Sequence, residues 1–216
     1  MNGLYFKFYL ALLLVFILSS ITYAKPITFT VSDELGRDNV SFTSDAPIEL
    51  IVGRTTKING MIIIDDSLDL KKLSPSVSFE VDLTSIDTGI PLRNEHMKDN
   101  FLETKKYPKA VFKVKQVTYN SQNKLADSIP LKLSAKGDFS VHGVTVAKNI
   151  PVKVTYFKES DFTHSKFEHG DVIKIQSTFD IPLDEHKIKR PKVIFQKLAD
   201  TVTVSIDAYA VQNIVK

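Results

Sequence analysis

Hydrophobic and polar residues alternate along most of the chain, which is the period of a β-strand with one apolar and one polar face. In the segment 77–83, Val77, Phe79, Val81 and Leu83 alternate with polar neighbours, and the alternation over 131–143 predicts one long strand. The same pattern recurs in the segments 27–31, 40–44, 57–64, 110–115, 152–156, 173–181 and 202–210. The sequence therefore predicts an antiparallel all-β protein with about eight strands.

Long strands with unpaired edges invite aggregation, and closing a sheet into a barrel removes those edges. We therefore predict an antiparallel barrel of about eight strands, with one or two short helices in the connections. The interior of such a barrel is either filled by side chains or wide enough for one small ligand. Small residues on the apolar face, which either leave room or permit close packing, are Gly60, Ala135, Gly137, Gly143, Ala208 and Ala210.

The connection between the strands 77–83 and 110–115 is too long and polar for a plain turn. Pro91 suits the first turn of a helix, and Met97 and Phe101 lie one turn apart on it. A weaker helix pattern covers 68–73. We interpret the longer connection as a lid-like segment at one end of the barrel. Its candidate rim or lid residues are Asp87, Arg93, His96, Met97, Phe101 and Tyr107.

The N-terminus has the pattern of a secretory signal peptide. A weakly charged start precedes an apolar run, Phe8–Leu18, and small residues follow up to Ala24. A retained membrane anchor is the alternative, but the run is short for a span of ~20 residues. We predict a signal peptide over 1–24, cleavage after Ala24, a single domain over 25–216, and a periplasmic or secreted protein.

Composition narrows the classes of function. The chain has no cysteine, which excludes disulfides and thiolate metal sites. Its net charge is +3, and its one basic cluster, 187–192, is typical of a solvated loop. A phosphate backbone demands a clustered basic surface, so we expect no nucleic-acid partner.

Catalytic and metal-binding motifs are missing from the sequence. It contains no nucleophile elbow, no His-Glu-x-x-His pair and no glycine-rich phosphate loop. Asp87, Arg93 and His96 form either a proton-handling cluster or hydrogen bonds that fix the connection to the barrel rim. The residues of the turn 158–171 with metal-binding chemistry are His164, Glu168, His169 and Asp171. Polar residues are expected in such a turn, so we predict no catalytic residue, no cofactor and no metal.

Two longer motifs resemble a known family. SIDTGIPLRNEHMKDNFLETKKYPKAVFKVKQV, residues 85–117, is similar to the central signature of the YceI-like family, and GDFSVHGVTVAKNIPVKV, residues 137–154, to its second signature. STFDIPLDEHKIKRP and LADTVTVSIDAYA resemble its C-terminal strands. One departure is DAPIELIVGRTTKINGMI, residues 45–62, which lacks the histidine that many relatives carry there.

The resemblance implies a lipocalin-like barrel, exported, that encloses a long isoprenoid or similar amphiphile in an apolar lumen for transport, storage or sequestration. It does not imply catalysis. The partner that it implies is the amphiphile. A transient contact with a membrane or membrane protein and a homodimer are two further partner hypotheses. The candidate lumen residues are Phe29, Phe42, Ile58, Ile62, Phe79, Val81, Phe112, Val114, Leu133, Phe139, Val141, Val154, Phe179, Val202 and Val204.

A solid barrel would present the same inward residues, so two other functions stay open at this point. The first is a surface adhesin or partner-binding module on a solid barrel. The second is an enzyme on small isoprenoids or redox lipids that uses Asp87, Arg93 and His96.

Overall fold

Strands make up most of the described chain. The computed structural model describes residues 25–33, 35–70, 77–119, 123–167, 169–190 and 197–214. Its strands are β1 (Pro26–Val31), β2 (Asn39–Ala46), β3 (Glu49–Thr55), β4 (Ile58–Asp65), β5 (Ser78–Asp82), β6 (Lys109–Tyr119), β7 (Pro130–Val141), β8 (Val144–Phe157), β9 (Val172–Pro182) and β10 (Thr201–Gln212). The helical elements are η3 (Leu83–Ser85), α2 (Pro91–His96), η4 (Met97–Phe101), α3 (Asp161–His164) and η5 (Leu183–His186).

Some predictions fall on residues outside these ranges. They are the signal peptide 1–24, residues 71–73 of the helix pattern over 68–73, Glu168, and the last two residues of the basic segment 187–192. Among the described residues, no helix has the length and apolar character needed to cross a membrane.

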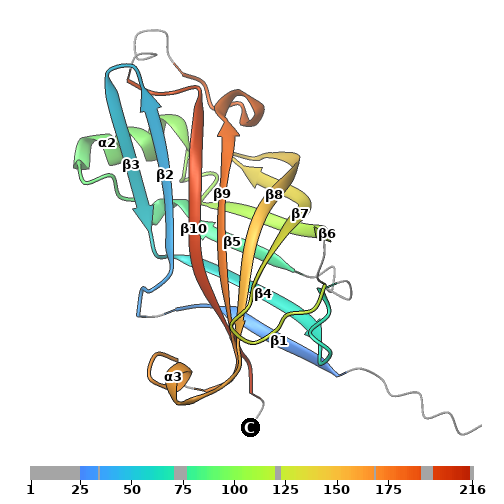
Figure 1. The fold of residues 1–216 in the computed structure, drawn as a ribbon. Helices are drawn as coiled ribbons and strands as arrows, with labels where there is room; N and C mark the ends of the chain where they lie inside the picture. The colour runs from blue at the N-terminus through green and yellow to red at the C-terminus, as the bar shows by residue number, and fades with distance from the viewer. Residues whose placement is uncertain are drawn as a thin grey trace, which may run out of the picture.

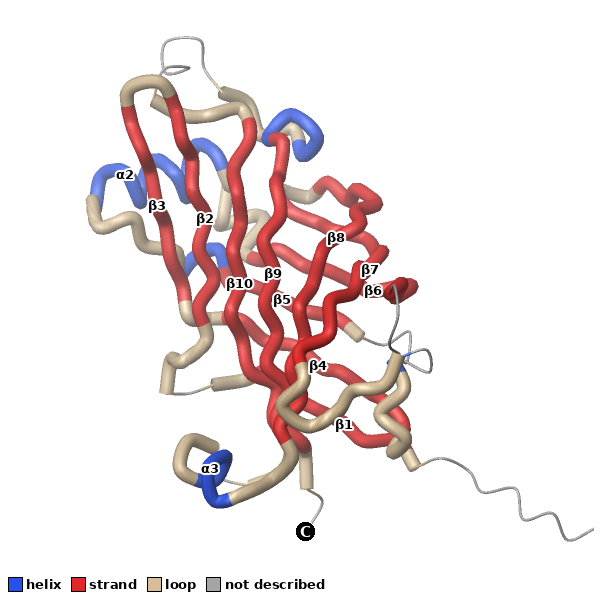
Figure 2. Tube along the Cα trace, viewed as in Figure 1, coloured by secondary structure: helices blue, strands red, loops and turns tan. Residues whose placement is uncertain are grey.

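Eight strands close into a barrel. Their order is β1-β4-β5-β6-β7-β8-β9-β10, and β10 pairs back onto β1. All of the pairings between named strands are antiparallel. β2 and β3 form a hairpin that continues the sheet beyond β10 (Figures 1 and 2). The predicted barrel of about eight antiparallel strands with short helices in its connections is confirmed.

β10 changes its partner along its length. Residues 203–207 pair with β2, whereas residues 210–212 pair with β1. Between these stretches the backbone N–H of Tyr209 donates to Oδ1 of Asp38 at 2.8 Å, so a side chain takes the place of a strand partner. The barrel is therefore closed by the β1–β10 pairing at one end, the closed end. At the other, the open end, the β2–β3 hairpin and the segment 86–102 form the wall (Figure 1).

The predicted strand over 131–143 is wrong at its C-terminal end. β7 stops at Val141, which pairs with Val144 at the start of β8, so the hairpin loop has only two residues. A two-residue loop of type I′ has positive φ at both positions, and His142 and Gly143 have φ of 53° and 72°. β8 accordingly begins at Val144, well before the predicted start at Val152.

β3 was not predicted. Its sequence, ELIVGRT, carries three consecutive apolar residues instead of an alternation. The hairpin that it forms with β2 nevertheless supplies one wall of the open end, so the missed strand bears directly on the site.

His142 anchors the β7–β8 turn. Its Nδ1 lies 3.0 Å from the carbonyl oxygen of His186, and its Nε2 lies 3.1 Å from Oε2 of Glu103. The ring of Tyr107 meets the His142 ring edge-on, with 5.1 Å between the centroids. The turn is thus fixed to two other loops.

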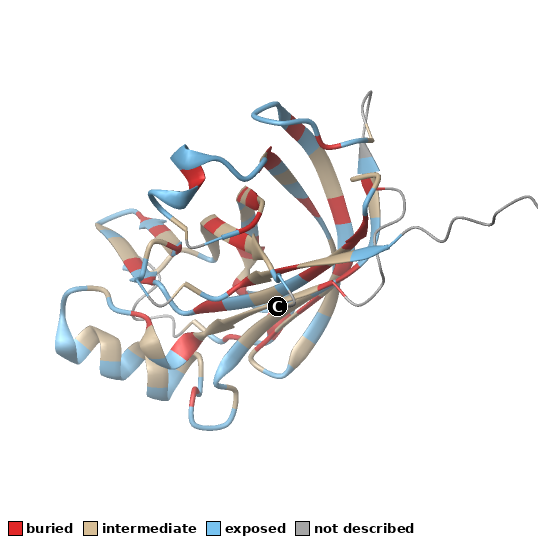
Figure 3. Cartoon of the chain, turned by 90° about the horizontal axis from the view of Figure 1, so that it is seen from below, coloured by how far each residue is buried: buried red, intermediate tan, exposed pale blue. Residues whose placement is uncertain are grey.

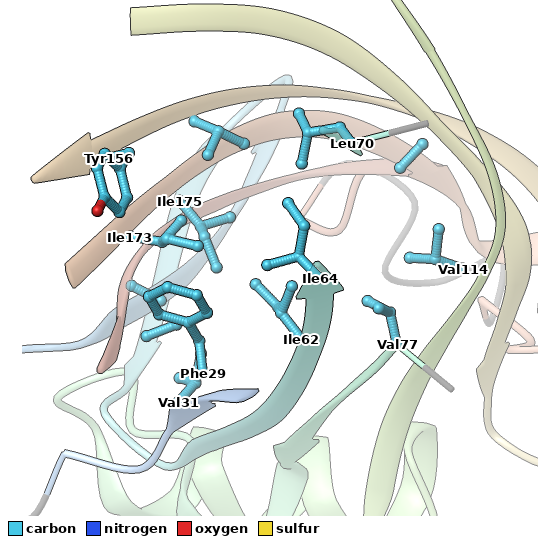
Figure 4. Packing of buried hydrophobic residues seen from close by; sticks show 14 of the residues in the cluster. Phe29, Val31, Ile62, Ile64, Leu70, Val77, Val114, Tyr156, Ile173 and Ile175 are labelled. Carbon is cyan, nitrogen blue, oxygen red and sulfur yellow. The ribbon is translucent and has the colours of Figure 1, made fainter. Parts of the chain in front are cut away.

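Side chains fill the closed end of the barrel. Phe29, Val31 and Ile64 retain at most 1% of their surface. Figure 4 shows them, with Ile62 and Ile175, gathered inside the strands that carry them. Buried and exposed positions alternate along the strands (Figure 3), which is the pattern that the sequence predicted. The closed end is therefore an ordinary packed core.

The inward glycines permit close packing and do not create space. A Cβ atom on Gly60 would lie 2.3 Å from the Phe79 ring, and one on Gly137 would lie 2.2 Å from the carbonyl oxygen of Lys113. Of the small residues that the sequence singled out, Ala135 and Ala208 do line a cavity. The larger cavity has none of these small residues in its wall, and it lies where β2 and β3 form part of that wall.

Candidate functional site

Two adjoining cavities occupy the interior. The larger one, at the open end, has a volume of about 450 Å³ and is walled by β2, β3, β9, β10 and the segment 86–102. The smaller, inner one has a volume of about 130 Å³ and extends toward the closed end. Their walls share Val81, Ala110, Phe139, Phe179 and Ile206. The lumen is thus filled at one end and hollow toward the other.

The walls are almost entirely apolar. Ser177 is the one polar residue among the described residues that line the inner cavity, and its hydroxyl donates to the carbonyl oxygen of Pro151 at 2.7 Å. The polar side chains of the larger cavity are Ser41, Glu49, Thr88, Arg93, His96 and Lys197. The hydrocarbon part of an amphiphile would therefore meet no unpaired polar side chain in the inner cavity. Its polar end can be accommodated only in the larger cavity.

An aromatic pair stands where the cavities meet. The rings of Phe139 and Phe179 pack edge to face, with centroids 5.9 Å apart and an angle of 80° between their planes. Because both residues line both cavities, as Ala110 does, this pair lies at the boundary between the two cavities.

Fourteen of the fifteen predicted lumen residues line one or both cavities, and Phe29 is the exception. Those that line the inner cavity are Ile58, Ile62, Phe79, Val81, Phe112, Val114, Leu133, Phe139, Val154 and Phe179. Those that line the larger cavity are Phe42, Val81, Phe139, Val141, Phe179, Val202 and Val204. Phe29 lies in the packed closed end with no exposed surface. Ligand contact by the fourteen stays a prediction.

The predicted lid divides into two groups. Arg93, His96, Met97 and Phe101 lie on α2 and η4 and line the larger cavity, whereas Asp87 and Tyr107 do not. α2 begins with Pro91 at its first turn, as predicted, and continues as the π-helical turn η4. The connection thus forms a side wall of the open end.

Asp87 fixes the start of this wall to β3. Its backbone N–H donates to the carbonyl oxygen of Arg54 at 2.9 Å, and the reverse bond is 2.8 Å long. The Asp87 carboxylate accepts hydrogen bonds from the Asn94 side chain and the Gly89 N–H. These bonds, that from Asn94 first, lower the pKa of Asp87. Asp87 therefore braces the segment from outside the cavity.

Arg93 holds the wall to the β2–β3 hairpin. Its Nη1 donates to Oε1 of Glu49 at 2.9 Å, its Nε to Oγ1 of Thr88 at 3.0 Å, and its Nη2 to the Thr88 carbonyl oxygen at 2.9 Å. A guanidinium with three such acceptors fixes the geometry well, because its donors form a rigid fork. Arg93 and Glu49 thus join the two sides of the cavity mouth.

Residues 26–210 match the YceI-like domain. The chain belongs to the YceI-like family. No curated protein matches the chain.

Solved structures share the fold of this YceI-like protein. BcnA of Burkholderia cenocepacia is similar with a TM-score of 0.62 and 17% identity, over 83% of this chain and 98% of BcnA. A polyisoprenoid binding domain from Saccharophagus degradans gives 0.62 and 16%, over 88% of this chain and 100% of that domain. A YCEI protein of Campylobacter jejuni gives 0.57 and 17%, over 76% and 85%.

Sequence reasoning missed several residues of the YceI-like cavity. Ile51 and Gly53 come from β3, Ile86 from the loop after η3, and Ile188 from the loop after η5. The adjacent β-branched residues Ile51 and Val52 were the available signal for β3. The two loops carried no periodic signal.

Proposed function

We propose that this YceI-like protein holds a long isoprenoid or similar amphiphilic lipid in the barrel lumen, for transport, storage or sequestration. The observation that carries the proposal is the pair of adjoining apolar cavities, of about 450 and 130 Å³. A similar fold is described as a polyisoprenoid binding domain. A solid barrel with an adhesive surface is less well supported, because the inward side chains at the open end surround empty space.

The apolar wall is sufficient to hold a hydrocarbon tail. Each buried CH₂ group contributes ~0.8 kcal/mol, so two isoprene units of ~10 carbons supply about 8 kcal/mol before costs. Loss of translational freedom and ordering of the tail offset several kcal/mol of this. Further isoprene units add affinity without any polar contact, which matches a lumen with one polar residue on its inner wall.

The polar end of the ligand has a defined place in this proposal. Glu49, Arg93, His96 and Lys197 all line the larger cavity, and Glu49 is paired with Arg93. The tail extends past Phe139 and Phe179 into the inner cavity, and the head group stays beside His96 and Lys197. The proposal assigns no bond-breaking step, and the absence of catalysis stays a prediction.

Native mass spectrometry of gently purified protein tests the proposal. We expect a co-purified long-chain amphiphile, or uptake of an added prenyl quinone by the empty protein. Ala110→Phe fills the passage between the cavities and is expected to abolish the adduct. Ala147→Phe, on an exposed position of β8, is the matched control and should keep it. A bare chain mass with no uptake would contradict the proposal.

Loading from a membrane surface is part of the proposal. Ile90 and Leu92 line the larger cavity, yet 48% and 61% of their surface is exposed. Aliphatic side chains at the mouth of a lipid cavity favour the membrane interface, where the ligand resides. Leu92→Ser should weaken co-flotation with phospholipid vesicles. Phe162→Ser, which removes an exposed ring from α3 at the opposite end, should not (Figure 1).

Export completes the proposal. The pattern of residues 1–24 predicts that the mature chain begins at Lys25 in the periplasm or outside the cell. Sequencing of the N-terminus of protein from the periplasmic and secreted fractions tests this, and an intact Met1 on all exported protein would contradict it. The native mass spectrum also reports whether the predicted homodimer forms.

A further inference from the structure

Three side chains converge in the β8–β9 connection, at the closed end (Figure 1), and none of them lines either cavity. Oε1 of Glu159 lies 2.6 Å from Nε2 of His164 and 3.6 Å from Nδ1 of His169. One ligand atom from each of the three residues lies within 4.8 Å of the others. The imidazole rings stand edge to face, with their centroids 5.2 Å apart. Two imidazoles therefore point at one carboxylate oxygen from different sides.

We propose that Glu159, His164 and His169 bind one divalent transition-metal ion, with zinc as the reference ion. Two imidazole nitrogens and one carboxylate oxygen form a donor set that zinc commonly accepts, with solvent in the remaining position. This differs from the residues that the sequence suggested. Glu159 is new, Glu168 lies outside the described residues, and Asp171 is engaged elsewhere.

The spacing of the three donors fits a metal after small side-chain rotations. Zinc lies ~2.0–2.1 Å from nitrogen and oxygen ligands, so the donors of a tetrahedral site are about 3.3 Å apart. The Glu159–His169 separation of 3.6 Å is close to this value. The Glu159–His164 separation of 2.6 Å is a hydrogen bond that must lengthen. All three residues are exposed at the surface, so their side chains have room for that movement.

The backbone beneath the three residues is fixed in place. The Glu159 N–H donates to Oδ1 of Asp171 at 2.8 Å, and Oδ2 of Asp171 accepts from the Tyr156 hydroxyl at 2.5 Å. A capping box between Ser160 and Thr163 starts α3. These bonds give Asp171 a structural role and set the direction from which Glu159 and His164 approach the site.

The far side of the turn is fixed as well. The Phe167 ring packs against Tyr209 of β10, with 5.4 Å between the centroids, and the Arg37 guanidinium lies 4.2 Å from its centre. His169 follows two residues later. A metal-binding turn held at both ends loses little conformational freedom on binding, which favours affinity.

A simple ion pair between Glu159 and a protonated histidine is the competing explanation. The two explanations differ at alkaline pH, because metal binding requires neutral imidazoles whereas the ion pair requires a charged one. The donor set favours copper, nickel and zinc over magnesium and calcium.

Equilibrium dialysis of the untagged protein against zinc chloride at pH 8, followed by elemental analysis, tests the proposal. We expect one bound zinc ion per chain at micromolar free zinc. An excess of magnesium should not displace it. Glu159→Gln, His164→Gln and His169→Gln should each weaken binding about ten-fold or more. His96→Gln, which removes an exposed histidine of α2 at the other end of the barrel, is the matched control and should retain the ion.

A nuclear magnetic resonance titration of the wild-type chain gives an answer that does not depend on any variant. Of the five histidines, the ring signals of His164 and His169 should shift on addition of zinc. Absence of stoichiometric zinc, binding by the Glu159 and His164 variants as tight as that of the wild type, or a shift confined to His96 would each overturn the proposal. Lipid uptake by the zinc-free protein is measured separately, so failure here leaves the proposed function unaffected.

Discussion

The two ends of the barrel have the same alternating sequence pattern but different interiors. At the closed end, β10 pairs with β1, and Phe29, Val31 and Ile64 leave at most 1% of their surface exposed. At the open end, β10 pairs with β2 instead, and Phe42, Phe179 and Val202 face inward yet stay partly accessible. The change of partner along one strand thus separates a packed core from a cavity. Binding space here follows from sheet topology more than from residue size.

Truncation of an aromatic ring at each end should show the largest difference. Phe29→Ala removes a fully buried ring and leaves a void, so we expect a loss of about 3–5 kcal/mol in the free energy of unfolding. Phe42→Ala, the matched variant at the open end, enlarges an existing cavity and should cost about 1–2 kcal/mol. Urea denaturation measures both, and equal losses would contradict the contrast between the ends.

Asp38, at the point where β10 changes partner, should make stability depend on pH. Burial raises the pKa of this carboxyl from 3.8 to about 6, against the lowering effects of the Tyr209 N–H and Arg37, while Asp33 and Asp207 raise it further. The folded protein therefore binds the proton more tightly than the unfolded chain. The protonated Asp38 carboxyl contributes its full stabilisation below about pH 4. This contribution, at most about 3 kcal/mol, is lost as the pH rises through about 6.

Asp38→Asn isolates this dependence. The amide oxygen still accepts the hydrogen bond from Tyr209, but no charge is buried. We expect the variant to gain about 1–2 kcal/mol relative to wild type between pH 4 and pH 8. Asp45→Asn, on an exposed position of β2, controls for the loss of a negative charge. Parallel pH profiles for wild type and Asp38→Asn would show that Asp38 does not titrate in this range.

Two glycine variants compare a new methyl group that meets backbone with one that meets a side chain at the cavity. In Gly137→Ala the new methyl group meets the Lys113 carbonyl oxygen at 2.2 Å, and backbone cannot move aside cheaply. We expect a loss of about 1–3 kcal/mol. In Gly53→Ala it meets the Phe42 ring at 2.2 Å, but that ring borders the larger cavity and can turn into it. Thermal denaturation should give a clearly higher Tm for Gly53→Ala than for Gly137→Ala.

Arg93→Gln should have the smallest effect on stability and a visible one on ligand release. The ion pair with Glu49 is partly exposed, so its loss costs less than about 1 kcal/mol. Because Arg93 joins the two sides of the mouth, a fluorescent prenyl probe should dissociate several-fold faster. Lys115→Gln removes a comparable pair with Asp138 on the outer face and is the control. An unchanged dissociation rate of the probe from Arg93→Gln would contradict the role of Arg93 in holding the two sides of the mouth together.

The sequence predicted the strands well because a period of two survives in any half-buried strand. It could not separate Phe29 from Phe42, since both are inward aromatic residues in alternating segments. Only the partner of β10 distinguishes them, and that partner is a long-range property. β3 escaped because Leu50, Ile51 and Val52 do not alternate, and the strand has the cavity on one face and solvent on the other. Glu159 escaped because its neighbours His164 and His169 approach it only through the turn around α3.

The most direct test of the central claim is a map of nuclear Overhauser contacts between a bound prenyl lipid and the methyl groups of the barrel. The account predicts contacts to Val202 and Ile181 of the larger cavity, and none to Val31 or Ile64 of the closed end. Contacts confined to exposed methyl groups such as that of Ile214, or no contacts at saturating lipid, would contradict it.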